Sequence, residues 1–155
     1  MEITSNEKQW TVTEIELSYR SKIKASLRPS VKSSRDAYQI LRNHWDQNQI
    51  EFVEQFKLLL TDRASKVLGI VDISSGGLTC TVADPRIIFA AALKARACGI
   101  VAAHNHPSGN LIPSDVDLVL TRKLKEAGKL LEITLLDHII ITSESYASLA
   151  DQGYI

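Results

Sequence analysis

The sequence contains only two cysteines, Cys80 and Cys98, which form no C-x-x-C pair. Two cysteines are too few for the disulfide framework of a small secreted domain. We therefore expect reduced thiols in the core. The polar segment from Met1 to Trp10 also lacks the apolar stretch of a secretory signal. Together these absences predict a cytoplasmic protein.

An excess of charge of one sign is also lacking, because 18 basic residues balance 18 acidic residues. A formal net charge of +0 gives the chain no global attraction to nucleic acid or to an anionic membrane, although a local patch can still attract either. The longest strictly apolar run, Ile87 to Leu93, is too short to cross a bilayer. We therefore expect no membrane association.

The remaining composition is that of a globular domain, with 155 residues of which 45% are hydrophobic and 23% charged. The order of strand-like and helix-like segments predicts an α/β (α+β) fold with helices packed on a mixed sheet. We place the domain at residues 34–155. Residues 1–33 are either part of it or appended to it, with a strand predicted at Ile15–Tyr19 from its alternating pattern.

A basic stretch connects these two parts, because Arg20 to Arg35 contains six basic residues and no acidic residue. One interpretation is a solvated loop and strand edge, where lysine discourages edge pairing. The other is a patch for phosphate or for an acidic partner. We favour the first, because the stretch lacks the interleaved aromatics typical of nucleic-acid binding.

Hydrophobic periodicity predicts the elements of the domain. Strands are expected at Glu54–Leu60, Lys66–Ile73, Leu78–Val82, Gly99–Ala103, Leu131–Leu136 and His138–Thr142. Helices are expected to begin at Ser33 or Ser34, at Asp84-Pro85 and at Ser114, the last ending near Gly128, with a short helical turn from Ser145.

The segment that follows the all-apolar strand Gly99–Ala103 contains the candidate metal ligands. His104 and His106 are two residues apart, so both imidazoles project to the same side of an extended chain and can share one metal ion. Asp117 follows eleven residues later at the start of a helix, and the loop is long enough to bring its carboxylate to the same point. Two imidazoles and one carboxylate leave a fourth position open, which is typical of catalytic Zn²⁺.

Each part of this pattern has a simpler interpretation. Ser114 and Asp117 have the spacing of a helix capping box, and taken alone we would interpret them as a cap. Two histidines on a loop are also common. The combination of same-side histidines, a Pro-Ser-Gly loop and a helix-start aspartate within one short segment nevertheless favours a metal site.

This motif resembles that of the JAMM metalloproteases, in which His-x-His is followed after seven residues by Ser-x-x-Asp. All four positions match, at His104, His106, Ser114 and Asp117. The longer string HNHPSG is similar to the RadC-like branch of JAB/MPN domain proteins, historically labelled as DNA repair proteins. The resemblance extends from about Ser34 to Tyr154. It includes the Glu-x-Phe-x-x-Leu-x-x-Asp pattern at Glu54–Asp62, and it implies a mixed sheet with cytidine-deaminase-like layering.

The resemblance implies a zinc-dependent peptidase or isopeptidase. Its general base would be Glu54, activating a zinc-bound water for attack on an amide; the nearby Glu51 falls outside the pattern. Ser114 would donate a hydrogen bond to the developing oxyanion or to the water. Asp137 and His138 either support the ligands from behind or form a turn, and we favour a structural role.

Two function classes follow from these observations. The first is a metallohydrolase acting on a peptide or protein substrate. The second is a non-enzymatic DNA repair or recombination accessory that binds nucleic acid, suggested by the RadC label and by the basic stretch. Balanced charge and the lack of the helix-hairpin-helix region of many RadC proteins count against the second. A zinc deaminase is excluded, because H-x-E and P-C-x-x-C are lacking. The sequence leaves open whether the chain forms a homodimer.

Overall fold

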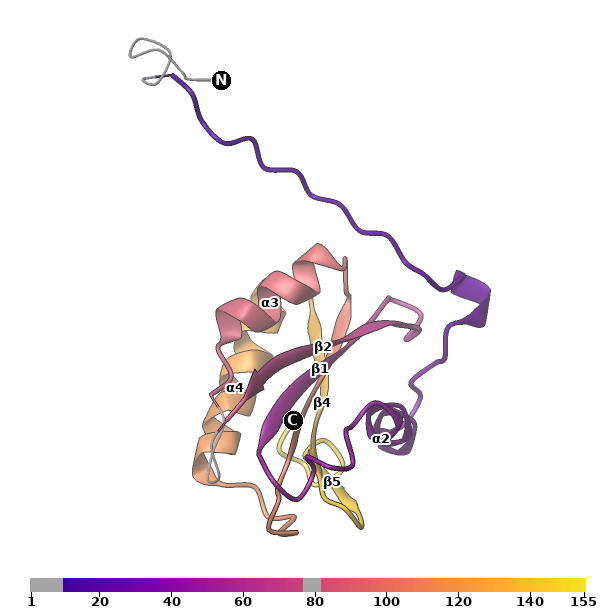
Figure 1. Ribbon diagram of the computed structural model, residues 1–155, viewed down its shortest axis with the longest axis vertical. Helices are drawn as coiled ribbons and strands as arrows, with labels where there is room; N and C mark the ends of the chain where they lie inside the picture. Colours follow the sequence, from indigo (N-terminus) through magenta and orange to yellow (C-terminus); the bar gives the residue numbers. More distant parts are fainter. Residues whose placement is uncertain (1–9, 77–81) are drawn as a thin grey trace.

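The computed structural model of the chain describes residues 10–76 and 82–155. A five-stranded sheet of order β2-β1-β3-β4-β5 forms its centre (Figure 1), and only β3 and β4 pair in parallel. The strands are β1 (Gln55–Thr61), β2 (Val67–Ser75), β3 (Gly99–Asn105), β4 (Thr134–Ile141) and β5 (Tyr146–Ser148). The helices are the short η1 (Ala25–Leu27), α2 (Ser34–Asn43), α3 (Pro85–Lys94) and α4 (Asp115–Leu130). The predicted mixed α/β fold is therefore confirmed.

Helices cover both faces of the sheet (Figure 1). On one face α3 and α4 bury Ile88, Phe89 and Leu124 against the sheet, whereas α2 packs Leu41 into a second core on the opposite face. The start of α3 agrees with the sequence, because the Asp84 side chain accepts a hydrogen bond from the Arg86 N–H at 2.8 Å. Each central strand is therefore enclosed on both sides.

The register of β1 against β3 positions the site. Phe56 of β1 lies opposite His104 of β3 in this antiparallel pair. Phe56 faces the α3–α4 core, together with Leu58 and Leu60, as the predicted alternation requires. Because side chains alternate along a strand, Glu54 just before β1 and His106 just after β3 come to the same end of the sheet and the same face as His104.

The predicted N-terminal strand is wrong. Residues 10–20 contain no strand and run away from the sheet (Figure 1), with Ile15 82% and Leu17 88% exposed. An alternating sequence becomes a strand only when it finds a neighbour to pair with, and this segment finds none among the described residues. The strand predicted at Leu78–Val82 falls largely outside the described residues, as does Cys80, whereas Cys98 is half-buried.

The C-terminal predictions need three corrections. The two strands expected there are one strand, β4, in which a bulge at Leu136 interrupts the alternation and makes one strand look like two. The turn expected to be helical after Ser145 forms β5. Helix α4 continues through Gly128, which is buried where the Ile133 carbonyl oxygen packs too closely to admit a Cβ atom. This glycine thus serves packing rather than helix termination. No helix within 10–76 or 82–155 has the length and hydropathy needed to cross a membrane.

Candidate metal centre

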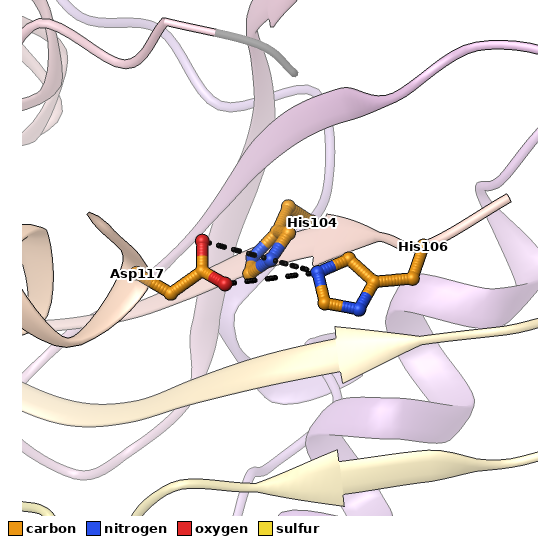
Figure 2. Close-up of side chains that lie close together, drawn as sticks. All are labelled: His104, His106 and Asp117. Carbon is orange, nitrogen blue, oxygen red and sulfur yellow. Dashed lines mark hydrogen bonds and ion pairs between the residues drawn. The ribbon is translucent and has the colours of Figure 1, made fainter. Parts of the chain in front are cut away.

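His104 and His106 come from the end of β3, where the strand leaves the sheet. The His104 side chain is buried, and the His106 side chain keeps 15% of its surface exposed. The His106 N–H donates to the Ile141 carbonyl at 2.9 Å, so β4 still holds the backbone one residue beyond β3. Both imidazoles turn toward Asp117 on α4 (Figure 2). The same-side placement predicted from their spacing is therefore confirmed.

A buried chain of hydrogen bonds behind His104 fixes which of its nitrogens carries the proton. The Thr121 hydroxyl donates to the Asp117 backbone carbonyl at 2.7 Å, so its oxygen accepts from His138 Nδ1, 2.6 Å away. His138 Nε2 is then left to accept from His104 Nδ1 at 2.8 Å. A neutral His104 consequently presents a bare Nε2 to the site, which is the form that a metal ion needs.

The loop after β3 determines the tautomer of His106 in the same way. Its Nδ1 lies 2.6 Å from the Asn110 backbone carbonyl, which can only accept, so the neutral ring is bare at Nε2. The loop folds back because the Gly109 N–H bonds to the His106 carbonyl at 3.0 Å. Gly109 has a φ of +83°, a conformation that side-chain-bearing residues rarely adopt. The Pro-Ser-Gly loop therefore orients the second histidine.

Asp117 caps α4 and faces the two histidines with the same carboxylate. Its Oδ2 accepts the Ser114 N–H and hydroxyl, both at 2.7 Å, and the Ser114 oxygen accepts the Asp117 N–H in return. The capping box inferred from the sequence is thus confirmed. The other carboxylate oxygen, Oδ1, lies 3.2 Å from His104 Nε2. Asp117 is therefore both the helix cap and a candidate ligand. The capping bonds to Oδ2 determine that Oδ1 points at His104.

The donor atoms of these residues fit a single cation. One ligand atom from each of His104, His106 and Asp117 lies within 4.8 Å of the others. The two Nε2 atoms are 3.0 Å apart, and His106 Nε2 is 3.7 Å from Asp117 Oδ2. Ligands about 2.0–2.1 Å from a tetrahedral zinc ion would be roughly 3.3 Å apart. Two bare imidazole nitrogens at this distance repel each other unless a proton or a metal ion lies between them, so the geometry is compatible with a shared proton or with a bound metal ion.

A proton on Nε2 of either histidine also satisfies the cluster, because that N–H then donates to the Asp117 carboxylate. The hydrogen bond to Asp117 raises the pKa of His106, against the opposing effect of burial. Burial by itself would raise the pKa of Asp117, but hydrogen bonds from His104 and His106 outweigh it and hold this pKa well below its usual range. Complete burial lowers the pKa of His138. Asp117 is thus a stable anion, and His138 remains the neutral partner that its hydrogen bonds require.

The cluster opens into a groove of about 960 Å³. Glu54 lines this groove on the β1 side, half-buried, whereas Glu51 is exposed. The other walls are mainly apolar, and Val116 and Ile112 remain 74% and 72% exposed beside the cluster. Among the described lining residues, Lys123 is the single basic side chain other than the histidines.

Asp137 and His138 have different surroundings although they are adjacent. Asp137 accepts from the Ser148 hydroxyl at 2.6 Å and from the Ala150 N–H at 3.0 Å, so it ties the turn after β5 to β4. Burial raises its pKa despite these bonds. His138 lies behind His104 instead. No sequence pattern points to Thr121, because its part in the cluster depends on the packing of α4 against β4.

Comparison with known proteins agrees with this geometry. Residues 31–154 match the family model described as RadC-like JAB domain. The chain is 36% identical over 143 residues to a UPF0758 protein of Flavobacterium johnsoniae, covering 92% of this chain and 61% of that protein. It is 37% identical over 148 residues to a UPF0758 protein of Syntrophomonas wolfei, covering 91% and 60%. The chain thus spans about three fifths of the length of these relatives. On the strength of the family match and these relatives, the chain belongs to the RadC-like JAB domain family.

Proposed function

We propose that this protein is a zinc-dependent metallohydrolase that cleaves an amide, as a peptidase or an isopeptidase. The observation that carries the proposal is the convergence of His104 Nε2, His106 Nε2 and Asp117 Oδ1 at the floor of a groove that Glu54 also lines. Three protein ligands leave the fourth position of a zinc ion open to solvent or substrate. When bound, Zn²⁺ would polarise the amide carbonyl and bring the pKa of a water molecule toward neutrality.

The side chains of this site have distinct tasks in that reaction. Glu54 would accept the proton of the attacking water and pass it to the leaving nitrogen as the C–N bond breaks. Ser114 would stabilise the developing oxyanion; its hydroxyl proton is directed to Asp117 Oδ2, so this task requires the hydroxyl to rotate when substrate binds. The apolar groove walls would hold an extended peptide with apolar side chains flanking the scissile bond.

The test compares wild type with Glu54→Gln, using Glu51→Gln as a matched control from the same segment. Each purified protein is assayed for bound zinc and for hydrolysis of a peptide library and of an isopeptide-linked peptide pair. We expect all three to bind zinc and Glu54→Gln alone to lose about 10²–10⁴-fold in rate. A wild-type protein that takes up no zinc, or equal activity of both variants, would refute the proposal.

A nucleic-acid accessory role is the second candidate, favoured by the exposure of the basic side chains Arg20, Lys22 and Lys24. Binding through these cations would weaken steeply with salt, and a Lys22→Ala/Lys24→Ala variant would reduce the slope of log K against log salt by about two. Titration of labelled single- and double-stranded DNA at several salt concentrations tests it. Affinity that is undetectable at low salt excludes this role.

A further inference from the structure

The residue between the two histidines has a side chain that the proposed mechanism does not use. Asn105 is fully buried, and it lies on the opposite face of the β3 end from His104 and His106. Its side chain therefore points away from the candidate metal and toward residues 50–55, which lead into the start of β1. Three polar atoms of that segment lie within hydrogen-bond distance of it.

These three contacts clamp the backbone around Glu54. Asn105 Oδ1 accepts from the Gln55 N–H at 2.7 Å, and Asn105 Nδ2 donates to the Val53 carbonyl at 2.9 Å. The same Nδ2 donates to the Ile50 carbonyl at 2.8 Å. The residues immediately before and after Glu54 are thus both bound to one side chain. Since Asn105 lies between His104 and His106, its side chain also links the segment around Glu54 to the strand end that carries the two histidines.

The clamp lies beyond the end of the ladder that joins β1 to β3, although β2 still pairs with β1 as far as Gln55. The paired register of β1 and β3 ends at Phe56 opposite His104, so ladder hydrogen bonds stop two residues short of Glu54. The Glu54 carbonyl accepts from the Gly76 N–H at 2.8 Å, which ties the same residue to the end of β2. Beyond that ladder, the Asn105 side chain joins this segment to β3 through the three hydrogen bonds above.

We propose that Asn105 is a positioning residue that fixes Glu54 relative to the metal cluster, through hydrogen bonds to Val53 and Gln55 on either side of it. This inference rests on the proposed function, in which Glu54 is the base. A general base must lie within hydrogen-bond reach of the proton that it takes, and a displacement of about 1 Å can cost about 10²-fold in rate. The histidines keep their own supports, His138 and Asn110, so loss of the clamp leaves metal binding in place.

The experiment compares Asn105→Ala with Val101→Ala. Val101 is fully buried on the same face of β3 and pairs with Leu59 rather than with the start of β1, so it controls for lost stability. Three quantities are measured in each: zinc affinity by chelator competition, kcat and KM for peptide hydrolysis, and amide exchange at Gln55 by NMR. The milder Asn105→Ser, which introduces a polar hydroxyl that is too short to span the clamp, serves if the alanine variant does not fold.

For Asn105→Ala we expect zinc affinity within about twofold of wild type and kcat lowered about 10- to 100-fold, with KM changed less than about threefold. Exchange at Gln55 should rise at least about tenfold, because its N–H loses its buried acceptor. Val101→Ala should leave kcat and Gln55 exchange unchanged. Equal effects in both variants, or unchanged kcat and exchange in Asn105→Ala, would overturn the inference.

Failure of the proposed function gives a different result. If wild type binds zinc but hydrolyses no amide, the proposed function fails while the clamp is still tested by exchange at Gln55. Loading wild type and Asn105→Ala with Co²⁺ adds a geometric measurement, since paramagnetic shifts of the Glu54 amide report its position relative to the metal. Shifts at Glu54 that are the same in wild type and Asn105→Ala then exclude a positioning role.

Discussion

Replacing His138 tests the structural argument for the metal centre most directly. His138 Nε2 accepts the proton of His104 Nδ1 at 2.8 Å in a fully buried position. In His138→Leu that N–H has no acceptor, which costs about 1–3 kcal/mol. His104 can avoid the penalty by moving its proton to Nε2, where it occupies the position that a metal ligand must leave bare. Either response weakens metal binding.

The expected loss of zinc affinity can be taken from supporting hydrogen bonds behind metal-binding histidines in other proteins. Loss of the partner behind a metal-binding histidine lowers affinity by about 10- to 100-fold, or about 1.4–2.7 kcal/mol. His138→Gln should lose less, because its amide oxygen can still accept from His104. Zinc dissociation constants by chelator competition, at a pH where the histidines are neutral, measure the effect.

Ile139→Val is the control for lost stability, because Ile139 is fully buried in the other core and the change costs about 0.5–1.5 kcal/mol of folding free energy. It should leave the zinc affinity unchanged. The reasoning is refuted if folded His138→Leu binds zinc as tightly as wild type, since the hydrogen-bonded chain would then have no bearing on the His104 tautomer.

The charge on His106 and the packing of Gly128 can be tested in the same way. Apparent zinc affinity should fall by up to about tenfold per pH unit below the raised pKa of His106, because the metal needs the neutral ring; titrations between pH 5 and 8 that show no dependence would contradict this. The metal-free protein should behave in the opposite sense: the His106–Asp117 interaction is fully present below the ordinary pKa of 6.5 and is lost as pH rises through the raised pKa, so urea midpoints should fall over that window. Gly128→Ala should destabilise the fold by about 1–3 kcal/mol or more, because its Cβ would lie 2.2 Å from the Ile133 carbonyl oxygen; an unchanged urea midpoint would count against the described packing, and Ala127→Gly is the matched change one residue away.

The sequence alone determined the parts that depend on local spacing. Two histidines at positions i and i+2 must share a side of an extended chain, and Ser114 three residues before Asp117 must be able to cap a helix. The start of α3 at Asp84-Pro85 and the buried strand before His104 are local in the same sense. These features needed no knowledge of distant contacts.

Tertiary structure decided everything that depends on which segments become neighbours. The alternating residues Ile15–Tyr19 match a strand pattern yet form none, because no partner strand reaches them within the described residues. The bulge at Leu136 made one strand resemble two. His138 and Asn105 obtained their roles only when β4 packed beside β3 and the chain before β1 closed over it. Hydrogen bonds between residues 34 to 55 positions apart leave no periodic trace in a sequence, so the supports of the site had to come from the fold.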